Sequence, residues 1–366
     1  MNGIDLDGDR VRDEVQAHHR ALIDSCETLA GIRSVEVGTS PCDVIYTQDK
    51  LRLLHYVTEQ PDDPETRSSR DATACRTPLL ICYALVNRPY VVDLDKRRSL
   101  VRKLLALGID LYLLDWGYPD ADDSHLDLDD YINDYLNTCV DQVRLHSDQD
   151  QINLLGICQG GTFSLCYSAL YPHKIKNLIT LVTPVDFKTP DNLLSHLAQQ
   201  VDVDLAVDTY GNIPGSMLND AYKALMPMRL GIQKQLHMPT QLQDRSKALN
   251  FLRMEKWIHD SPDQAAEAFR QFIRDFFQHN KLIQGQIMLG GRSVRLENIH
   301  QPVLNIYGEQ DHLVPPSAST PLAQHISSTD YEALPVAAGH IGIFVGKRAQ
   351  NLLAPHIAQW LRQRDD

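Results

Sequence analysis

A cysteine lies in a G-x-C-x-G box directly after an apolar run, and no other part of the chain constrains the fold as strongly. Residues 152–157 are mostly apolar, as in a buried strand, and a helical stretch begins at Gly161. A strand that turns sharply into a helix crosses itself so closely that a side chain at Gly156 or Gly160 would collide. Such a turn exposes Cys158, and the N–H groups and dipole of the next helix favour a thiolate there.

Short apolar runs alternate with helical stretches along much of the chain, a pattern typical of a parallel β-sheet covered by helices. The expected strands are Pro78–Leu85, Ile109–Trp116, Ile152–Ile157, Asn177–Val182, Pro302–Tyr307 and Tyr331–Leu334. The expected helices are 10–32, Arg97–Leu107, Leu128–His146 and Gly161–Tyr171. We expect an exposed loop over residues 59–76, which are rich in Pro, Asp, Ser and Arg.

The strand, turn and helix around Cys158 resemble the nucleophile elbow of the α/β hydrolases, with sulfur where serine usually stands. This resemblance implies an α/β-hydrolase fold, with a mostly parallel central sheet flanked by helices. The alternation of strands and helices stops near residue 188 and resumes near residue 302. The expected parts are core residues 1–187 with an N-terminal helix, a largely helical cap over 188–297, and core residues 298–366. A second, unrelated helical domain is the alternative for the middle part.

A thiol nucleophile needs a base that takes its proton and an acid that orients the base. In α/β hydrolases the acid and then the histidine follow the nucleophile along the chain. Asp311 follows the fifth expected strand and is the expected acid, with Glu309 as a competitor. His340 follows the sixth strand after small residues that suit a close approach, and it is the expected base. His312 and His325 compete for that role, although His312 is better suited to holding the loop or contacting substrate.

An oxyanion hole normally combines the N–H after the nucleophile with one from a loop after an early strand. We therefore expect donors at Gln159 and within residues 86–88, where we choose Asn87; an ordinary strand-to-loop turn is the alternative there. The remaining cysteines are expected to be small buried hydrophobic residues. They are Cys26, Cys42, Cys75, Cys82, Cys139 and Cys166.

Composition excludes several functions. The formal net charge of -13 argues against general nucleic-acid binding, which needs a basic face. No stretch approaches the roughly 20 apolar residues of a membrane span, and the first residues do not have the pattern of a signal peptide. Seven cysteines with no C-x-x-C pair favour a reducing cytoplasm. We find neither clustered metal-ligand spacing nor a Gly-rich phosphate loop, so no metal or cofactor is expected.

Several segments together resemble the polyhydroxyalkanoate synthases. The similarity spans roughly residues 40–360, and the combination of motifs is far more specific than any one of them. The matching segments are Asn87–Tyr90, Asp115–Pro119, Gly156–Thr162, Val182–Phe187, Asp311–Pro316 and Gly339–Gly342.

The chain is similar to the short catalytic subunit of a class III synthase. The long extra N-terminal region of class I and II synthases is absent from this sequence. Class IV enzymes tend to have Met after the cysteine, where this chain has Gln159. The segment Met254–Ile258 also resembles class III. This resemblance implies a PhaE-type second subunit, a homodimer of catalytic subunits, and association with polyester granules in the cytoplasm.

By resemblance, the reaction polymerises (R)-3-hydroxyacyl-CoA, with 3-hydroxybutyryl-CoA foremost, and releases CoA through a Cys158 thioester. His340 would deprotonate Cys158 and later assist attack by a hydroxyl. Asp311 would either orient His340 or help to activate that hydroxyl, and the sequence leaves both roles open. Candidates to hold the CoA phosphates are Arg88, Lys96, Lys347 and Arg348, for which a solvated surface role is the simpler interpretation.

Two other functions remain as alternatives. A cysteine thioesterase or a dienelactone-hydrolase-like enzyme would share Cys158, Asp311 and His340 but would yield free acid. A non-catalytic, granule-associated subunit would keep the fold and would be indifferent to loss of Cys158. The long insert and the motifs outside the triad favour the synthase.

Overall fold

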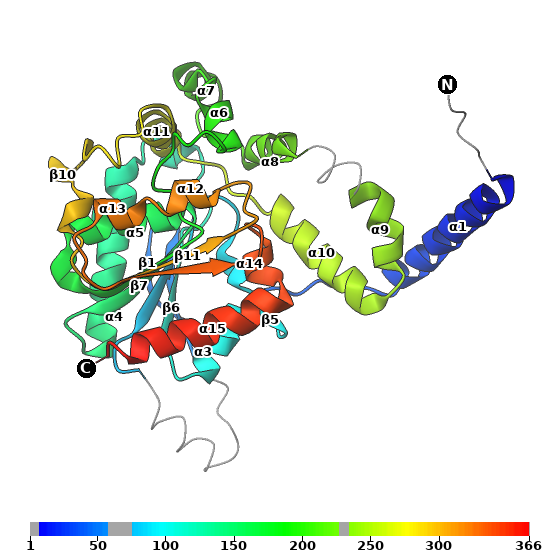
Figure 1. The fold of residues 1–366 in the computed structure, drawn as a ribbon, viewed down its shortest axis with the longest axis horizontal. Coiled ribbons are helices and arrows are strands. Elements are labelled where there is room, and N and C mark those ends of the chain that lie inside the picture. Colours follow the sequence, from blue (N-terminus) through cyan, green and yellow to red (C-terminus); the bar gives the residue numbers. More distant parts are fainter. Residues whose placement is uncertain (1–6, 58–74, 227–233, 366) are drawn as a thin grey trace, which may run out of the picture. The chain divides into compact units, whose positions relative to one another are not determined.

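The computed structural model describes residues 7–57, 75–226 and 234–365, and its centre is an eight-stranded sheet (Figure 1). The strands lie in the order β1-β2-β6-β3-β7-β8-β11-β12. The last six of these pair in parallel, whereas β1 and β2 are antiparallel to their neighbours. Parallel strands bring their carboxyl ends to one edge, where ligands bind in open α/β sheets.

All six expected strands are confirmed, with small shifts of their ends. They are β3 (Leu79–Cys82), β6 (Leu111–Asp115), β7 (Ile152–Ile157), β8 (Ile175–Leu181), β11 (Val303–Gly308) and β12 (Tyr331–Val336). Two further strands, β1 (Cys42–Gln48) and β2 (Leu51–Tyr56), were not predicted. Most of the expected loop at 59–76 lies outside the described residues.

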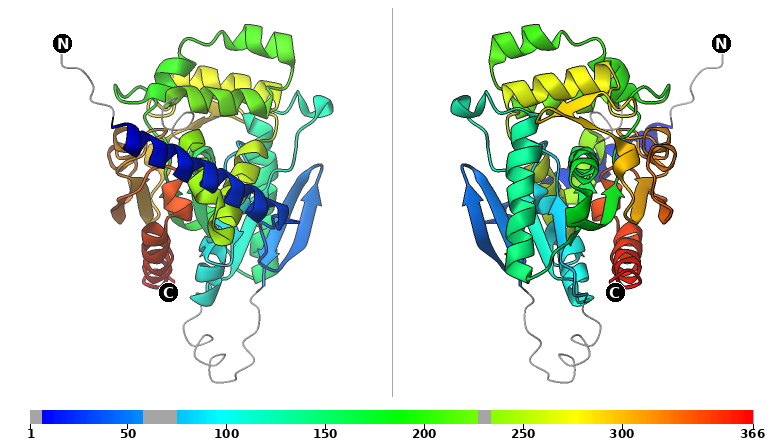
Figure 2. Two further views of the ribbon diagram at one scale, coloured as in Figure 1. Left: turned by 90° about the vertical axis from the view of Figure 1, so that its right-hand side faces the viewer. Right: turned by 90° about the vertical axis from the view of Figure 1, so that its left-hand side faces the viewer.

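Helices cover both faces of the sheet (Figure 2). On one face lie α4 (Asn137–Ser147), preceded by a π-helical segment at Asp130–Leu136, and α5 (Gln159–Leu170). On the other lie α3 (Leu100–Ala106) and α15 (Lys347–Arg362). Because β3, β6 and β7 are buried along their whole length, both of their faces are apolar, as the parallel arrangement requires.

The chain between β8 and β11 is largely helical, with one short hairpin that the sequence did not predict. Its helices are α6 (Leu193–Ala198), α7 (Val203–Tyr210), α8 (Gly215–Leu225), α9 (Lys234–Leu242), α10 (Arg245–His259) and α11 (Ala266–Gln271). A π-helical segment, Phe272–Gln278, and the hairpin β9 (Ile287–Leu289) and β10 (Arg292–Val294) follow.

The phenylalanine side chains of the π-helical segment Phe272–Gln278 extend the main core around the sheet. Phe272 stacks on Phe276, and both rings contact Phe187 at the end of the β8 loop. Phe272 also meets Phe163 of α5 edge to face, with ring centroids 5.9 Å apart. Such edge-to-face pairs contribute about 0.5–1.5 kcal/mol beyond buried area. They fix the segment 272–277 against the helix that follows Cys158.

Contacts divide the chain into two compact units. One comprises Gly38–Met217 and Ser261–Asp366 and holds the whole eight-stranded sheet. The other comprises Met1–Val37 and Leu218–Asp260. The boundaries between these units differ from the predicted boundaries at 187/188 and 297/298. The N-terminal segment belongs to the same unit as residues 218–260 and not to the unit that holds the sheet. The residues around the sheet include both ends of the predicted cap.

In the smaller unit, α1 (Gly8–Ala30) packs against helices more than 200 residues further along the chain. Ser25 donates a hydrogen bond to the Pro239 carbonyl oxygen at 2.8 Å, and Thr28 donates to that of Gln243 at 3.0 Å. Arg245 of α10 donates to the carbonyl oxygen of Gly31, just after α1, at 2.9 Å. These bonds join α1 to the region of α9 and α10.

Candidate active site

Cys158 stands at the turn between β7 and α5 in a backbone conformation that is unusual for any residue but glycine. Its φ is 54° and its ψ is -123°. Its N–H donates to the Leu181 carbonyl oxygen at the end of β8, at 2.9 Å, and its own carbonyl accepts from Gly161 at 2.9 Å. Such backbone strain persists only where the surroundings fix it, and it clusters at functional sites. Its side chain is partly exposed, as a nucleophile requires.

The two glycines that flank Cys158 allow this turn. A Cβ at Gly156 would lie 2.4 Å from the Gly161 Cα, and a Cβ at Gly160 would lie 2.3 Å from the Cys82 carbonyl oxygen. Both distances are far below van der Waals contact. As expected from the sequence, neither position has room for a side chain. The absence of side chains there lets α5 lie directly beside the end of β3.

Asp311 and His340 meet at the carboxyl edge of the sheet, in the loops after β11 and β12. His340 Nδ1 lies 2.7 Å from Asp311 Oδ2, and both side chains are buried. Asp311 Oδ1 accepts the N–H groups of Leu313 and Val314, each at 2.9 Å, so the carboxylate is held on both oxygens. Glu309, the competing acid, is exposed.

The small residues before His340 fulfil the expected role of allowing a close approach of the two loops. Gln310 donates its N–H to the Ala338 carbonyl oxygen at 3.1 Å, and Glu309 donates its N–H to the Val336 carbonyl oxygen at 2.9 Å. A Cβ at Gly339 would lie 3.2 Å from the Gln310 carbonyl oxygen. These contacts place His340 beside Asp311 although 28 residues separate them in the chain.

Cys158 is one of the groups that raise the pKa of His340, so its side chain lies close to the imidazole and the structure brings the expected nucleophile, base and acid together. Burial alone would lower the pKa of His340, but its interactions with Asp311 and Cys158 outweigh that effect. The net result is a His340 pKa well above its ordinary value of 6.5. Because Nδ1 faces Asp311, Nε2 is the nitrogen left for the sulfur. This chain of three groups can transfer a proton from the thiol to the imidazole.

The loop after β3 lies beside the elbow, and its backbone is held by side chains from elsewhere. Asn87, the chosen second oxyanion donor, has a φ of 59°. Gln159 is buried, and its Oε1 accepts the N–H of Leu85 at 3.1 Å, so the residue after the nucleophile reaches this loop with its side chain. The assignment of Gln159 and Asn87 as backbone donors remains a prediction.

Arg88 is not a candidate for binding CoA phosphates, because it is buried in an ion pair. Its guanidinium contacts Asp115 at 2.7 Å and donates to the Gly117 carbonyl oxygen at 2.7 Å. It also lies 4.2 Å from the centre of the Tyr118 ring. Asp115 ends β6 and was recognised in the sequence only as part of a motif. The other three basic candidates, Lys96, Lys347 and Arg348, are exposed.

The expectation for the remaining cysteines is right for four of them and wrong for two. Cys75, Cys82, Cys139 and Cys166 are buried. Cys26 and Cys42 are exposed, because they lie on outward faces of α1 and of the edge strand β1. The competing histidines His312 and His325 are both partly buried, and it is His340 whose imidazole contacts the Asp311 carboxylate.

One residue near the site gave no signal in the sequence. Asn280 follows the π-helical segment 272–278, and its Oδ1 accepts the N–H of Phe187 at 2.9 Å. Its Nδ2 donates to Asp186 at 2.8 Å. Asn280 thus ties the end of the inserted helices to the loop after β8, through partners more than 90 residues away in the chain.

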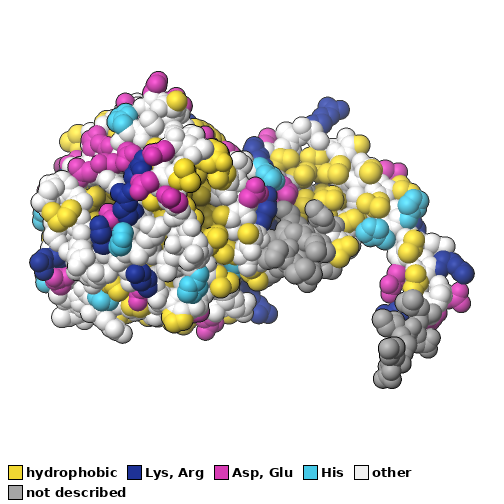
Figure 3. Space-filling model, turned by 90° about the horizontal axis from the view of Figure 1, so that it is seen from above, with side chains coloured by type: hydrophobic (Ala, Val, Ile, Leu, Met, Phe, Trp, Pro, Cys, Tyr) yellow, Lys and Arg dark blue, Asp and Glu magenta, His cyan; other side chains and the backbone are white. Residues whose placement is uncertain are grey.

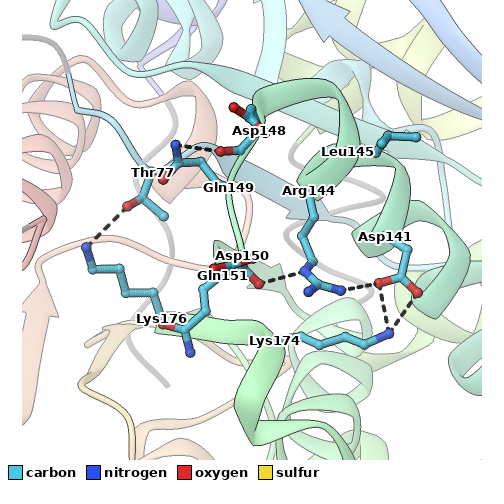
Figure 4. A pocket seen from close by; sticks show the side chains of 10 residues that line it. All are labelled: Thr77, Asp141, Arg144, Leu145, Asp148, Gln149, Asp150, Gln151, Lys174 and Lys176. Atoms are coloured by element: carbon cyan, nitrogen blue, oxygen red, sulfur yellow. Dashed lines mark hydrogen bonds and ion pairs between the residues drawn. The ribbon is translucent and has the colours of Figure 1, made fainter.

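A pocket of about 760 Å³ lies away from these residues, at the opposite edge of the sheet (Figure 4). Its lining includes Thr77 before β3, Gln151 before β7 and Lys176 at the start of β8. Those positions are at the amino ends of strands whose carboxyl ends approach Cys158. Its cations have partners of their own, since Lys174 and Arg144 both contact Asp141 at 2.7 Å. The pocket is therefore no part of the candidate active site.

The inserted helices α6 and α7 present apolar side chains to solvent. Figure 3 shows the face that includes this region, on which hydrophobic side chains gather between acidic and basic ones. The exposed apolar residues of the two helices are Leu193, Leu197, Leu205 and Tyr210.

Within the described residues, no helix is long and apolar enough to cross a membrane. Nor do three or more His, Cys, Asp or Glu side chains group there as metal ligands would.

Comparisons with known proteins agree with the observed fold and identify similar proteins within that fold family. Residues 77–347 match the model of the alpha/beta hydrolase fold family. The chain is 52% identical to the poly(3-hydroxyalkanoate) polymerase subunit PhaC of Allochromatium vinosum, over 100% of both chains. It is 48% identical to the subunit of the same name from Synechocystis, over 94% of this chain and 90% of that one.

Solved structures are similar in fold at much lower identity. A putative lipase from Sulfolobus solfataricus superposes with a TM-score of 0.51 at 16% identity, covering 91% of this chain and 98% of that one. The enol-lactonase from Burkholderia xenovorans LB400 gives a TM-score of 0.50 at 14% identity, covering 88% and 99%. At such identities the similarity shows the fold alone.

Proposed function

Because this chain belongs to the PhaC family of poly(3-hydroxyalkanoate) polymerases, which are acyltransferases, we propose that it polymerises (R)-3-hydroxyacyl-CoA through a thioester on Cys158. The substrate we propose foremost is 3-hydroxybutyryl-CoA. The observation that carries the proposal is the arrangement at the strained turn, where His340 contacts Asp311 at 2.7 Å and lies close to Cys158.

The first half-reaction loads the enzyme. His340 takes the proton of Cys158, and the sulfur attacks the thioester carbonyl carbon of the substrate. The carbon–sulfur bond to CoA breaks, and the CoA thiolate leaves with the proton returned by His340. One thioester replaces another, so the exchange costs little free energy and the acyl group stays activated. This explains why sulfur serves better here than a serine oxygen.

The second half-reaction extends the chain. The 3-hydroxyl of a growing chain or of a second monomer attacks the acyl carbon on Cys158 while His340 accepts its proton. A new ester bond forms, the carbon–sulfur bond to Cys158 breaks, and His340 returns the proton to the sulfur, which regenerates the thiol. Both oxygens of Asp311 are engaged, one by His340 and the other by two backbone N–H groups. This favours the orienting role for Asp311 over direct activation of the hydroxyl.

Water competes with the hydroxyl, and a polymerase must limit its access. His340 and Asp311 are buried, and aromatic residues of the inserted segment pack against the helix that follows Cys158. The proposal requires no metal or cofactor, because the CoA thioester itself supplies the activated acyl group.

We further propose, from the class III resemblance, that the catalytic subunit forms a homodimer and works with a PhaE-type second subunit. It would act in the cytoplasm at the surface of the polyester granules that it makes. The acidic net charge of -13 gives it no general affinity for nucleic acid.

A cysteine thioesterase is the second candidate function, because it would use the same three residues. The two functions differ in the fate of the acyl group, which water would release as a free acid. The full-length similarity to polymerase subunits favours polymerisation.

The thioester can be tested by trapping it. Wild-type protein mixed with 3-hydroxybutyryl-CoA and quenched in acid should carry acyl groups on the peptide that contains Cys158, as seen by mass spectrometry. Cys158→Ala should carry none and should release no CoA. Cys166→Ala, eight residues further along and fully buried in α5, is the matched control and should keep both signals. Acylation that survives in Cys158→Ala would refute the assignment.

A further inference from the structure

The loop between β3 and Asn87 is held at Leu85 by two glutamine side chains from distant parts of the chain. The Leu85 N–H donates to Gln159 Oε1 at 3.1 Å. The Leu85 carbonyl oxygen accepts from Gln264 Nε2 at 3.0 Å. Both glutamines are buried, at 8% and 4% exposure. Buried hydrogen bonds of this kind hold their partners firmly, since an unsatisfied buried group costs about 1–3 kcal/mol.

The bond from Gln264 fixes more than one atom, because a peptide group is a rigid plane. The carbonyl of Leu85 and the N–H of Val86 belong to the same peptide group and point in opposite directions when it is trans. No cis peptide bond occurs in the described part of the chain. Because the carbonyl oxygen points toward Gln264, the Val86 N–H points away from Gln264. If the peptide group were turned over, the Leu85 carbonyl oxygen would take the direction that the Val86 N–H now has.

Gln264 is itself held in place by its backbone. It pairs with Ile213 in both directions, each N–H donating to the other's carbonyl oxygen at 2.9 Å. Its side chain donates a further, longer bond to the Pro262 carbonyl oxygen at 3.3 Å. The backbone of Gln264 is thus held in place, and its side chain bonds Leu85, which is 179 residues away in the chain.

We propose that Gln264 is a positioning residue for the oxyanion hole, because it sets the orientation of the peptide group between Leu85 and Val86. The inference rests on the proposed function, and within the expected range 86–88 it takes the Val86 N–H, rather than that of Asn87, as the second oxyanion donor. Gln159 holds the preceding peptide from the other side, so the residue after the nucleophile contributes its side chain as well as its N–H. The two amides act together on one stretch of backbone.

Gln264→Leu tests this role, since it keeps the size of the side chain and removes the donor. Steady-state CoA release from 3-hydroxybutyryl-CoA should show kcat lowered about 10- to 100-fold, somewhat less than the ~10²–10³ lost with an entire donor. KM should stay within about twofold, because the donor acts on the transition state. Gln264→Glu presents a carboxylate to the Leu85 carbonyl oxygen, which favours a turned peptide, and should be slower still.

Gln278→Leu is the matched control. Gln278 Nε2 donates to the carbonyl oxygens of Ala198 and Val201 at 3.2 and 2.8 Å, away from the Leu85 loop. Its loss should lower the melting temperature as Gln264→Leu does and leave kcat unchanged. A Gln264→Leu protein that melts like the control but keeps wild-type kcat would overturn the inference.

A second variant covers the case in which Gln264→Leu does not fold. Gln264→Asn keeps a polar amide but shortens the side chain by one methylene, so it no longer reaches the Leu85 carbonyl oxygen and kcat should fall at nearly constant KM. Wild-type kcat in Gln264→Asn would overturn the inference. A wild-type protein that releases no CoA would overturn the proposed function and the inference together, whereas an active wild type with unaffected variants would overturn the inference alone.

Discussion

At the scale of single residues, His340 connects the chemistry of the site to the stability of the fold. Its pKa is raised above 6.5 although it is buried, because Asp311 and Cys158 favour the charged imidazole. The folded protein therefore binds a proton at His340 more tightly than the unfolded chain does. This contribution to stability is fully present below about pH 6.5 and is lost as the pH rises through the folded pKa.

We predict that the free energy of unfolding of wild type, minus that of His340→Gln, falls as the pH is raised from about 6 to 9. Chemical denaturation at a series of pH values measures it. Asp311→Asn removes the nearest negative charge. When both proteins carry this substitution, the difference in unfolding free energy between His340 and His340→Gln should depend less on pH. A difference that grows with pH would show that His340 is held neutral instead.

The sequence predicted the three residues that meet at the candidate site but not the contacts that hold the neighbouring loops. Cys158, Asp311 and His340 each follow a strand, so chain order and strand ends suffice to bring them to one edge. Gln264 has no such signal, because its partner Leu85 lies in a loop 179 residues away. Arg88 was misjudged for a similar reason, since its partner Asp115 is visible only once β3 and β6 are known to be neighbours.

At the scale of elements, the turn at Cys158 depends on the two glycines that let β7, α5 and β3 meet. We predict that Gly160→Ala either prevents folding or abolishes CoA release, because its Cβ would lie 2.3 Å from the Cys82 carbonyl oxygen. Overpacking of this kind typically costs about 1–3 kcal/mol, and backbone cannot move aside as a flexible side chain does. Circular dichroism, thermal melting and the CoA assay measure the outcome.

Gly8→Ala is the control for this prediction, since a Cβ at Gly8 meets nothing within 4 Å. It should match wild type in melting temperature and in CoA release. A Gly160→Ala protein with wild-type stability and activity would mean that the turn does not have the described geometry.

Strands that are buried on both faces were predictable from the sequence, whereas the half-exposed β1 was not. β3, β6 and β7 are continuous apolar runs between turn signals. β1 mixes exposed and partly buried positions, and its register with β2 shifts between Val44 and Tyr46. That irregularity breaks the alternation of polar and apolar residues on which strand prediction depends.

At the scale of the whole molecule, the N-terminal helix could be predicted as a helix but not as part of a unit with residues 218–260. The large apolar residues of α1, Val11, Val15, Leu22 and Ile23, are exposed, whereas its buried residues are Ala21 and Ser25, so the apolar pattern does not reveal the covered face. The partner helices α9 and α10 are separated from α1 by most of the sheet-forming sequence. Their pairing follows only from the structure.

We predict that Ala21→Arg, on the buried face of α1, disrupts this smaller unit without disturbing the sheet. Ala21 is 7% exposed and lies one turn before Ser25, which bonds Pro239. Hydrogen–deuterium exchange should rise in α9 and α10 and stay low in β7 and β11. Val15→Arg, at a position that is 63% exposed, should change neither region. Unchanged exchange in α9 with Ala21→Arg would contradict the pairing.

The central claim is that this chain joins hydroxyacyl groups through Cys158 rather than releasing them to water. The most direct measurement supplies (R)-3-hydroxybutyryl-CoA to the wild-type protein, alone and with a PhaE-type subunit, and follows CoA and the acyl product together. We predict CoA release that the second subunit stimulates, accompanied by insoluble polyester. CoA release with free 3-hydroxybutyrate as the only acyl product, second subunit present, would contradict the claim and identify a thioesterase on the same scaffold.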